Sequence, residues 1–147
     1  MEKGLSEIIR ESFGIEKKDL NTYSPLTLAF IGDAVFDIII RTGMVCNGNT
    51  RADRLHKNTS AIVKATTQSK MIDIILPHLS EEEEDVYKRG RNAKPRSTAK
   101  NAAIADYHKA TGLEALIGYL YLDDRTDRIL ELVNMGLECV EVPWKTN

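Results

Sequence analysis

Residues 26–40 are Leu-Thr-Leu-Ala-Phe-Ile-Gly-Asp-Ala-Val-Phe-Asp-Ile-Ile-Ile, the most apolar long segment of the chain. Nearly every position is apolar, so a helix here would be apolar around its whole circumference. Such a helix is buried at the centre of a fold or across an interface. The preceding Ser24-Pro25 is typical of a helix start, with a side-chain cap followed by proline in the first turn. We therefore predict a central helix from about residue 25 to Thr42, before Gly43.

Three charged side chains interrupt this apolar helix at a regular spacing. Asp33, Asp37 and Arg41 follow one another at intervals of four residues, which places them on one helix face. A carboxylate on a buried helix is costly unless it is paired or bound to a cation. Two interpretations compete. Either Asp37 pairs with Arg41 and Asp33 bonds to a nearby group, or the face lines a cleft in which Asp33 holds a metal ion.

A second apolar helix is predicted over residues 100–122, and it also carries an isolated acid. Glu114 is the only acidic residue within 113–122, and it shares a helix face with Thr111. If the two helices faced each other, Asp33 and Glu114 would supply the one or two carboxylates that Mg²⁺ prefers. Waters and phosphate oxygens would complete the shell. Spacing alone leaves open whether the two helices face each other.

The other long segments also predict helices, because none alternates apolar and polar residues as a strand does. The predicted helices cover about residues 5–13, 25–42, 50–76 with a break near Asn58, 80–89, 100–122 and 126–140. Gly14 is expected to end the first helix and Pro77 the third. The sequence therefore predicts an all-α fold, formed by one domain that spans residues 1–147.

Length and composition bound the class of protein. A chain of 147 residues favours a single domain with a real core, and 42% hydrophobic residues argue against disorder. Two cysteines, Cys46 and Cys139, are too few for a disulfide scaffold. The sequence shows no secretion leader and no apolar run of the roughly 18 residues that a membrane span needs. We expect a soluble, cytoplasmic protein.

The net charge of −2 hides an uneven distribution. Residues 81–85 carry only acids, and residues 87–109 hold seven basic side chains against one acid. Ser80 and Glu83 form a capping-box pattern, so the acids and the following bases predict a helix over 80–89 with Gly90 as its C-terminal cap. The next loop carries uncompensated positive charge at Arg91, Lys94, Arg96 and Lys100. It is either a solvated loop or a contact for phosphate groups.

Several blocks of sequence together resemble the ribonuclease III family, in its short mini-ribonuclease III branch without a double-stranded-RNA-binding domain. The resemblance covers about residues 24–122. It rests on Leu28-Ala-Phe-Ile-Gly-Asp-Ala-Val-Phe36, Leu55-His-Lys57, Lys64-Ala-Thr-Thr-Gln-Ser-Lys70, Lys88-Arg-Gly-Arg-Asn-Ala-Lys94 and Leu113-Glu-Ala-Leu-Ile-Gly118.

The resemblance implies an all-helical homodimer that cleaves structured or double-stranded RNA with Mg²⁺ and matures the ends of the 23S ribosomal RNA precursor. Asp33 matches the family's catalytic aspartate, and Glu114 matches its metal-binding glutamate. The larger ribonuclease III pattern has acids where this chain has Ala29 and Thr111, which leaves the number of metal ions open. Thr111 and Asp37 are candidates for the outer shell of the metal, although Asp37 could equally pair with Arg41.

Positive side chains are the expected RNA contacts under this resemblance. We assign that role to Arg91, Lys94, Arg96, Lys100, His56, Lys57 and Lys70. A large-subunit ribosomal protein is a further partner that the resemblance allows. The rival interpretation is a non-catalytic RNA-binding or ribosome-assembly protein on the same fold, in which the acids serve structure only.

Overall fold

The structure is a computed structural model that describes residues 2–93 and 102–144. Within these ranges the chain is helical and contains no strand, which confirms the all-α prediction. The α-helices are α1 (Leu5–Phe13), α2 (Pro25–Asn47), α3 (Ala52–Val63), α4 (Ala65–Ile75), α5 (Glu81–Asn92), α6 (Ala102–Leu122) and α7 (Thr126–Gly136). Short 3₁₀ turns lie at Leu20–Thr22, Leu76–His78 and Leu137–Cys139.

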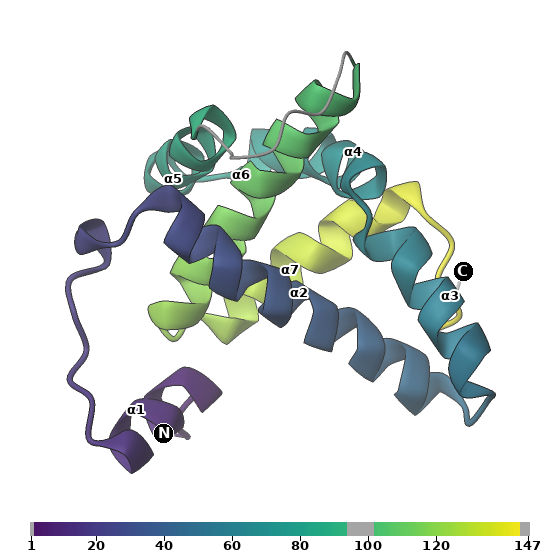
Figure 1. The fold of residues 1–147 in the computed structure, drawn as a ribbon, viewed down its shortest axis with the longest axis horizontal. Coiled ribbons are helices and arrows are strands. Elements are labelled where there is room, and N and C mark those ends of the chain that lie inside the picture. The colour runs from purple at the N-terminus through teal and green to yellow at the C-terminus, as the bar shows by residue number, and fades with distance from the viewer. Residues whose placement is uncertain (1, 94–101, 145–147) are drawn as a thin grey trace.

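Helices α2 and α6 cross at the centre of the molecule, and the other helices pack around this pair (Figure 1). Glycines allow the two backbones to touch. A Cβ atom added to Gly32 would lie 1.7 Å from the carbonyl oxygen of Glu114, and one added to Gly118 would lie 2.0 Å from that of Leu28. No side chain fits at either position, so the two glycines determine how closely the helices approach.

The core surrounds this crossing and contains the apolar residues expected from the sequence. Phe36 and Ile40 of α2, Leu116 and Leu120 of α6, and Ile72 of α4 are fully buried. Burial of such side chains contributes about 1.5–3 kcal/mol each. The predicted central helix is therefore confirmed, although one apolar face of it stays exposed. Ser24 caps the helix through its hydroxyl, which accepts the Thr27 amide at 3.2 Å.

Two glycines that were expected to end helices instead lie inside them. Helix α2 continues past Gly43 to Asn47, and α5 continues past Gly90 to Asn92. A Cβ atom at Gly43 would lie 2.7 Å from the Trp144 ring, and one at Gly90 would lie 2.7 Å from the Cβ of Ala115. These glycines serve tertiary packing rather than chain reversal. Gly14, by contrast, ends α1 in the left-handed conformation (φ 67°), as predicted.

The predicted helix over 50–76 breaks at Lys64, and the expectation of a break near Asn58 is wrong. Lys64 has extended backbone angles (φ −69°, ψ 156°) and separates α3 from α4. The Thr67 hydroxyl donates to the carbonyl of Ala61 at 2.8 Å, and the Gln68 amide donates to that of Val63 at 2.8 Å. These bonds satisfy carbonyls left without helical partners at the end of α3, so the polar residues of α4 stabilise the break.

The last predicted helix is shorter than expected. Instead of running to Val140, α7 ends at Gly136 and continues as the 3₁₀ turn Leu137–Cys139. Gly136 lies against Met71 of α4, where an added Cβ would come within 3.0 Å of that side chain. Among the helices of the described ranges, none has the length and apolar character needed to cross a membrane.

Candidate active site

The crossing of α2 and α6 brings Asp33 and Glu114 together. Asp33 follows Gly32, whose Cα lies against the backbone of Glu114, so the two carboxylates occupy adjoining positions at the contact. Asp33 is exposed and Glu114 is half-buried. Burial, followed by the hydrogen-bonding contact and negative charge of Asp33, raises the pKa of Glu114 to about 8. Two carboxylates this close favour a shared proton or a bound cation.

Gln68 of α4 supports Glu114 from the buried side of the site. It is 1% exposed, and its Nε2 donates to the Val63 carbonyl at 2.8 Å and approaches Glu114 Oε2 at 3.4 Å. Sequence reasoning did not single out this glutamine, although it lies in the Lys64–Lys70 block. The only indication of Gln68 in the sequence was that it is a polar side chain on a helix whose neighbouring residues lie in the core. Gln68 therefore links the α3–α4 break to the orientation of the Glu114 carboxylate.

The donor set suits a hard divalent cation. Oxygen ligands from one or two carboxylates, with waters and substrate phosphates, are the usual protein environment of Mg²⁺. Asp33 and Glu114 provide those carboxylates, while the buried Gln68 Oε1 has no hydrogen-bond partner among the described residues. No group of three or more His, Cys, Asp or Glu side chains converges within residues 2–93 and 102–144. The residues present therefore fit a magnesium ion bound through few protein ligands.

The two candidates for the outer shell of the metal are engaged within their own helices. The Thr111 hydroxyl donates to the Tyr107 carbonyl at 2.9 Å. Asp37 forms an ion pair with Arg41, with 2.6 Å between Oδ2 and Nε. The ion pair that the i,i+4 spacing suggested is thus present, and neither residue approaches Glu114 through a hydrogen bond that the structure shows.

The predicted RNA contacts are distributed over α3, α4 and α5. His56, Lys57 and Lys70 are exposed. Arg91 lies near the end of α5, with its guanidinium carbon 5.6 Å from the centre of the Tyr87 ring. The remaining predicted contacts, Lys94, Arg96 and Lys100, lie outside the described residues. Arg51 and Arg54, which the sequence analysis did not single out, line a surface hollow together with Lys57.

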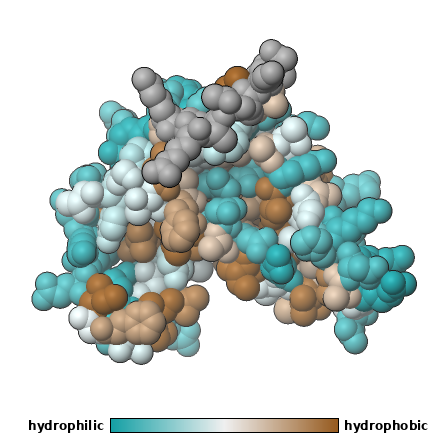
Figure 2. Space-filling model, in the orientation of Figure 1, coloured by the Kyte–Doolittle hydropathy of each residue, from teal (hydrophilic) through white to brown (hydrophobic). Residues whose placement is uncertain are grey.

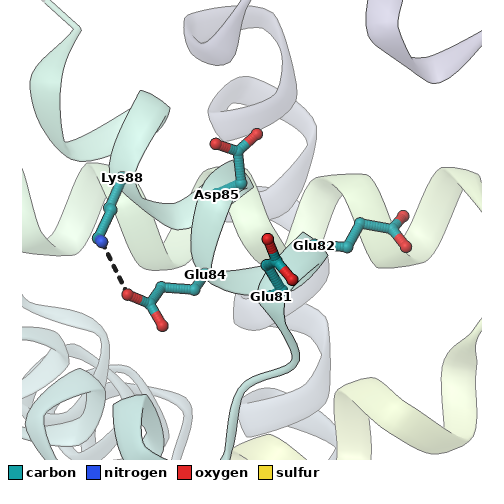
Figure 3. Close-up of a pocket in the computed structure, with 5 residues that line it drawn as sticks. All are labelled: Glu81, Glu82, Glu84, Asp85 and Lys88. Atoms are coloured by element: carbon teal, nitrogen blue, oxygen red, sulfur yellow. Dashed lines mark ion pairs between the residues drawn. The ribbon is translucent and has the colours of Figure 1, made fainter.

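A second hollow, at the start of α5, has the opposite charge (Figure 3). Its lining consists of Glu81, Glu82, Glu84, Asp85 and Lys88. Lys88 is paired with Glu84 at 2.8 Å, so the hollow keeps an excess of negative charge. These acids favour the N-terminal end of α5. A polyanion would be repelled at this hollow.

Comparison with known proteins agrees with the fold. Residues 26–125 match the family model described as Ribonuclease III domain. The chain is 51% identical over 121 residues to the Mini-ribonuclease 3 of Clostridium tetani, covering 80% of each chain. It is 40% identical over 141 residues to that of a Thermoanaerobacter species, covering 96% of this chain and 99% of the relative.

A solved structure extends the agreement to three dimensions. The X-ray crystal structure of a protein from Fusobacterium nucleatum superposes with a TM-score of 0.71 at 35% identity, covering 83% of this chain and 98% of the other. This chain belongs to the ribonuclease III family, in its mini-ribonuclease III branch. It is therefore an endoribonuclease that acts on RNA, and enzymes of this family generally use divalent metal ions. The rival interpretation as a non-catalytic binding protein is not favoured.

Proposed function

We propose that this endoribonuclease hydrolyses phosphodiester bonds of double-stranded RNA with Mg²⁺ held by Asp33 and Glu114. One observation carries the proposal: the α2–α6 crossing places an exposed carboxylate against a half-buried one, with the pKa of Glu114 raised to about 8. A protein retains such a costly pair when a cation or a reaction requires it.

Each residue of the site has a separate task. Asp33, at the exposed edge, is the ligand that an approaching substrate meets. Glu114 is the half-buried ligand, and the Gln68 amide donates toward its carboxylate at 3.4 Å. A bound divalent ion would lower the pKa of a water and neutralise charge on the attacked phosphate. The Gly32 and Gly118 contacts fix the separation of the two helices, and hence of the two ligands.

The proposed substrate contacts act on the RNA backbone. Double-stranded RNA is recognised mostly by shape, through phosphates and 2′-hydroxyls. Arg91, whose guanidinium carbon lies over the Tyr87 ring at 5.6 Å, offers a cation for such a phosphate. The other proposed contacts are His56, Lys57 and Lys70, together with Lys94, Arg96 and Lys100.

A homodimer would supply one site for each RNA strand, because a two-fold axis repeats the site. Helix α2 offers a surface for it. Leu26, Phe30, Ile38 and Val45 are exposed along α2, and Phe30 is 80% exposed. An exposed apolar stripe of this length is typical of an interface.

The proposed biological substrate is the 23S ribosomal RNA precursor, whose ends the enzyme would mature in the cytoplasm. A large-subunit ribosomal protein that presents the precursor is a proposed partner. We propose that residues 1–147 act as one catalytic domain, in which the basic residues named above hold the substrate.

Cleavage of a long RNA duplex tests the function. We expect the wild type to cut the duplex with Mg²⁺ and to stop when EDTA is added. Asp33→Asn should lose at least about 100-fold in rate, because the ligand charge is lost. Asp127→Asn, which changes an exposed aspartate on α7, is the matched control and should cut normally. Equal cutting by wild type and Asp33→Asn would remove Asp33 from the mechanism.

Metal binding is measured separately from cleavage. Mg²⁺ should raise the unfolding temperature of the wild type in proportion to the logarithm of its concentration, because the ion binds only the folded site. The same titration should leave Asp33→Asn and Glu114→Gln unchanged. If both variants respond as the wild type does, the ion binds elsewhere and the assignment of these ligands is wrong.

A further inference from the structure

Helix α1 turns polar residues toward its own chain and leaves its apolar residues exposed. Ser6 is buried, and Arg10 is half-buried in an ion pair with Asp124 at 2.9 Å. The exposed apolar side chains are Leu5, Ile8, Ile9 and Phe13, continued by Ile15. An amphipathic helix normally presents its apolar face to the core of its own domain. The described residues of the chain therefore leave this apolar face uncovered.

The attachment of α1 holds this apolar face in a defined place. Arg10 binds Asp124, and Lys17, in the segment that follows α1, lies 3.4 Å from Asp123. Both acids belong to the turn between α6 and α7. Apart from this turn, α1 makes few contacts, and Figure 1 shows it set apart from the helical body. Polar anchoring thus positions the helix without covering its apolar side chains.

The apolar face of α1 and the exposed stripe of α2 lie on one side of the molecule. Figure 2 shows apolar side chains over both helices, on either side of an open hollow. Nine large apolar side chains contribute to this surface: Leu5, Ile8, Ile9, Phe13, Ile15, Leu26, Phe30, Ile38 and Val45. They expose on the order of 900 Å², at roughly 100 Å² each. A standard stable interface buries about 800 Å² per partner.

We infer that the apolar face of α1 packs against a second copy of this chain, so that each protomer's α1 forms an arm that enlarges the dimer interface beyond the stripe of α2. The inference rests on the proposed homodimer. The nine side chains together expose enough apolar area for a stable dimer, and α1 with Ile15 contributes five of the nine. A two-fold axis places both surfaces of one protomer opposite the same two surfaces of the other.

The charges of α1 favour a protein partner over a membrane surface. Helices that lie on membranes are rich in Lys and Arg on their polar face. Helix α1 balances Glu7 and Glu11 against Arg10 and the preceding Lys3, which itself pairs with Glu11 at 2.8 Å. A polar face of mixed charge gains nothing from anionic lipid.

Sedimentation equilibrium of the full chain tests the arm. Ile9→Asp/Phe13→Asp places charges on exposed positions of α1, so the protomer should fold normally, as circular dichroism will show. We expect its dimer dissociation constant to rise at least about 30-fold, because two apolar contacts are lost and two charges must be desolvated. Leu130→Asp is the matched control, since it adds the same charge at an exposed leucine of α7. It should leave the constant within about threefold of the wild type.

Hydrogen exchange provides a second measurement. Amides of residues 5–13 should gain protection as the protein concentration rises through the dissociation constant. The inference alone is overturned if the wild type is a dimer that Phe30→Asp weakens but Ile9→Asp/Phe13→Asp does not. A wild type that stays monomeric overturns the proposed homodimer and the arm together, whereas Mg²⁺-dependent cleavage is measured independently of both.

Discussion

Glu83→Gln isolates the contribution of one buried ion pair. Glu83 is 2% exposed, and its two carboxylate oxygens accept bonds from Nε and Nη2 of Arg128, each at 2.8 Å. Glu83 also completes the predicted capping box, accepting the Ser80 amide at 2.8 Å. Glutamine can keep the capping bond, so the substitution removes the charge while it preserves the helix cap. Arg128, which also donates to the His78 carbonyl at 2.8 Å, joins α7 to the start of α5.

The loss of stability expected for Glu83→Gln follows from the lowered pKa of the Glu83 carboxylate. Bonds from Arg128 and Ser80 lower the pKa of Glu83 from 4.5 to about 2. A shift of this size corresponds to at most about 3 kcal/mol of stability. Because the pKa in the folded state is depressed, this stability is fully present above about pH 4.5 and is lost as the pH falls toward 2. Glu83→Gln should therefore lose about 2–3 kcal/mol at neutral pH.

Urea unfolding followed by circular dichroism measures this loss at fixed protein concentration. The difference between wild type and Glu83→Gln should narrow steadily between about pH 4.5 and pH 3, because the Glu83 carboxylate of the unfolded wild-type chain gains its proton in this range while that of the folded chain stays ionised. Glu81→Gln is the control, because Glu81 lies in the same first turn but is exposed. It should cost less than about 1 kcal/mol. A Glu83→Gln loss no larger than this, or one that persists unchanged at low pH, would refute the reasoning.

Three other predictions address the site. Gly118→Ala should lower the free energy of unfolding in urea by at least about 3 kcal/mol, because its Cβ would meet the Leu28 carbonyl at 2.0 Å. If the variant is as stable as the wild type, α2 and α6 can separate freely and the reasoning is wrong. With EDTA present, Glu114→Gln should be about 1–3 kcal/mol more stable than the wild type near pH 8. Because the pKa of Glu114 is raised in the folded state, the stability of the wild type falls as the pH rises from 4.5 to about 8. The difference in stability between Glu114→Gln and the wild type should therefore disappear at acid pH. A difference that does not vary with pH would contradict this. Arg91→Ala should weaken duplex binding at low salt and flatten its log–log salt dependence by about one unit, measured by fluorescence anisotropy; an unchanged slope would remove Arg91 from the phosphate contacts.

Sequence rules for helix capping predicted the helix ends well where the capping residue and its partner lie within a few residues of each other. The capping box of Ser80 and Glu83, the Ser24 cap and the Gly14 terminus all depend on neighbours in the chain, and the structure contains each of them. The same rules placed helix ends at Gly43 and Gly90 wrongly. A glycine is compatible both with a turn and with a close helix contact, and only the neighbour across the contact distinguishes the two.

The residues of the candidate site also fall into those that the sequence predicts and those that it does not. Asp33 and Glu114 could be singled out from sequence, because an acid on an apolar helix is conspicuous and the surrounding motifs resemble those of a known family. Gln68 could not, since its importance arises from burial and from the Val63 carbonyl and Glu114, 46 positions away. The partner of Glu83 was also hidden, because Arg128 belongs to a helix 45 residues further along the chain.

The residues alone predict a helical chain, most of its helix starts, and acids placed on two apolar helices. Those properties follow from periodicity and from hydrogen bonds between near neighbours. The folded chain alone shows that Asp33 and Glu114 meet, that Glu114 is half-buried with a raised pKa, and that α1 leaves its apolar face exposed. The physical reason is that burial and electrostatic coupling depend on distances through space. Here those distances are set by the contacts of Gly32 and Gly118 between helices that lie some eighty residues apart in the chain.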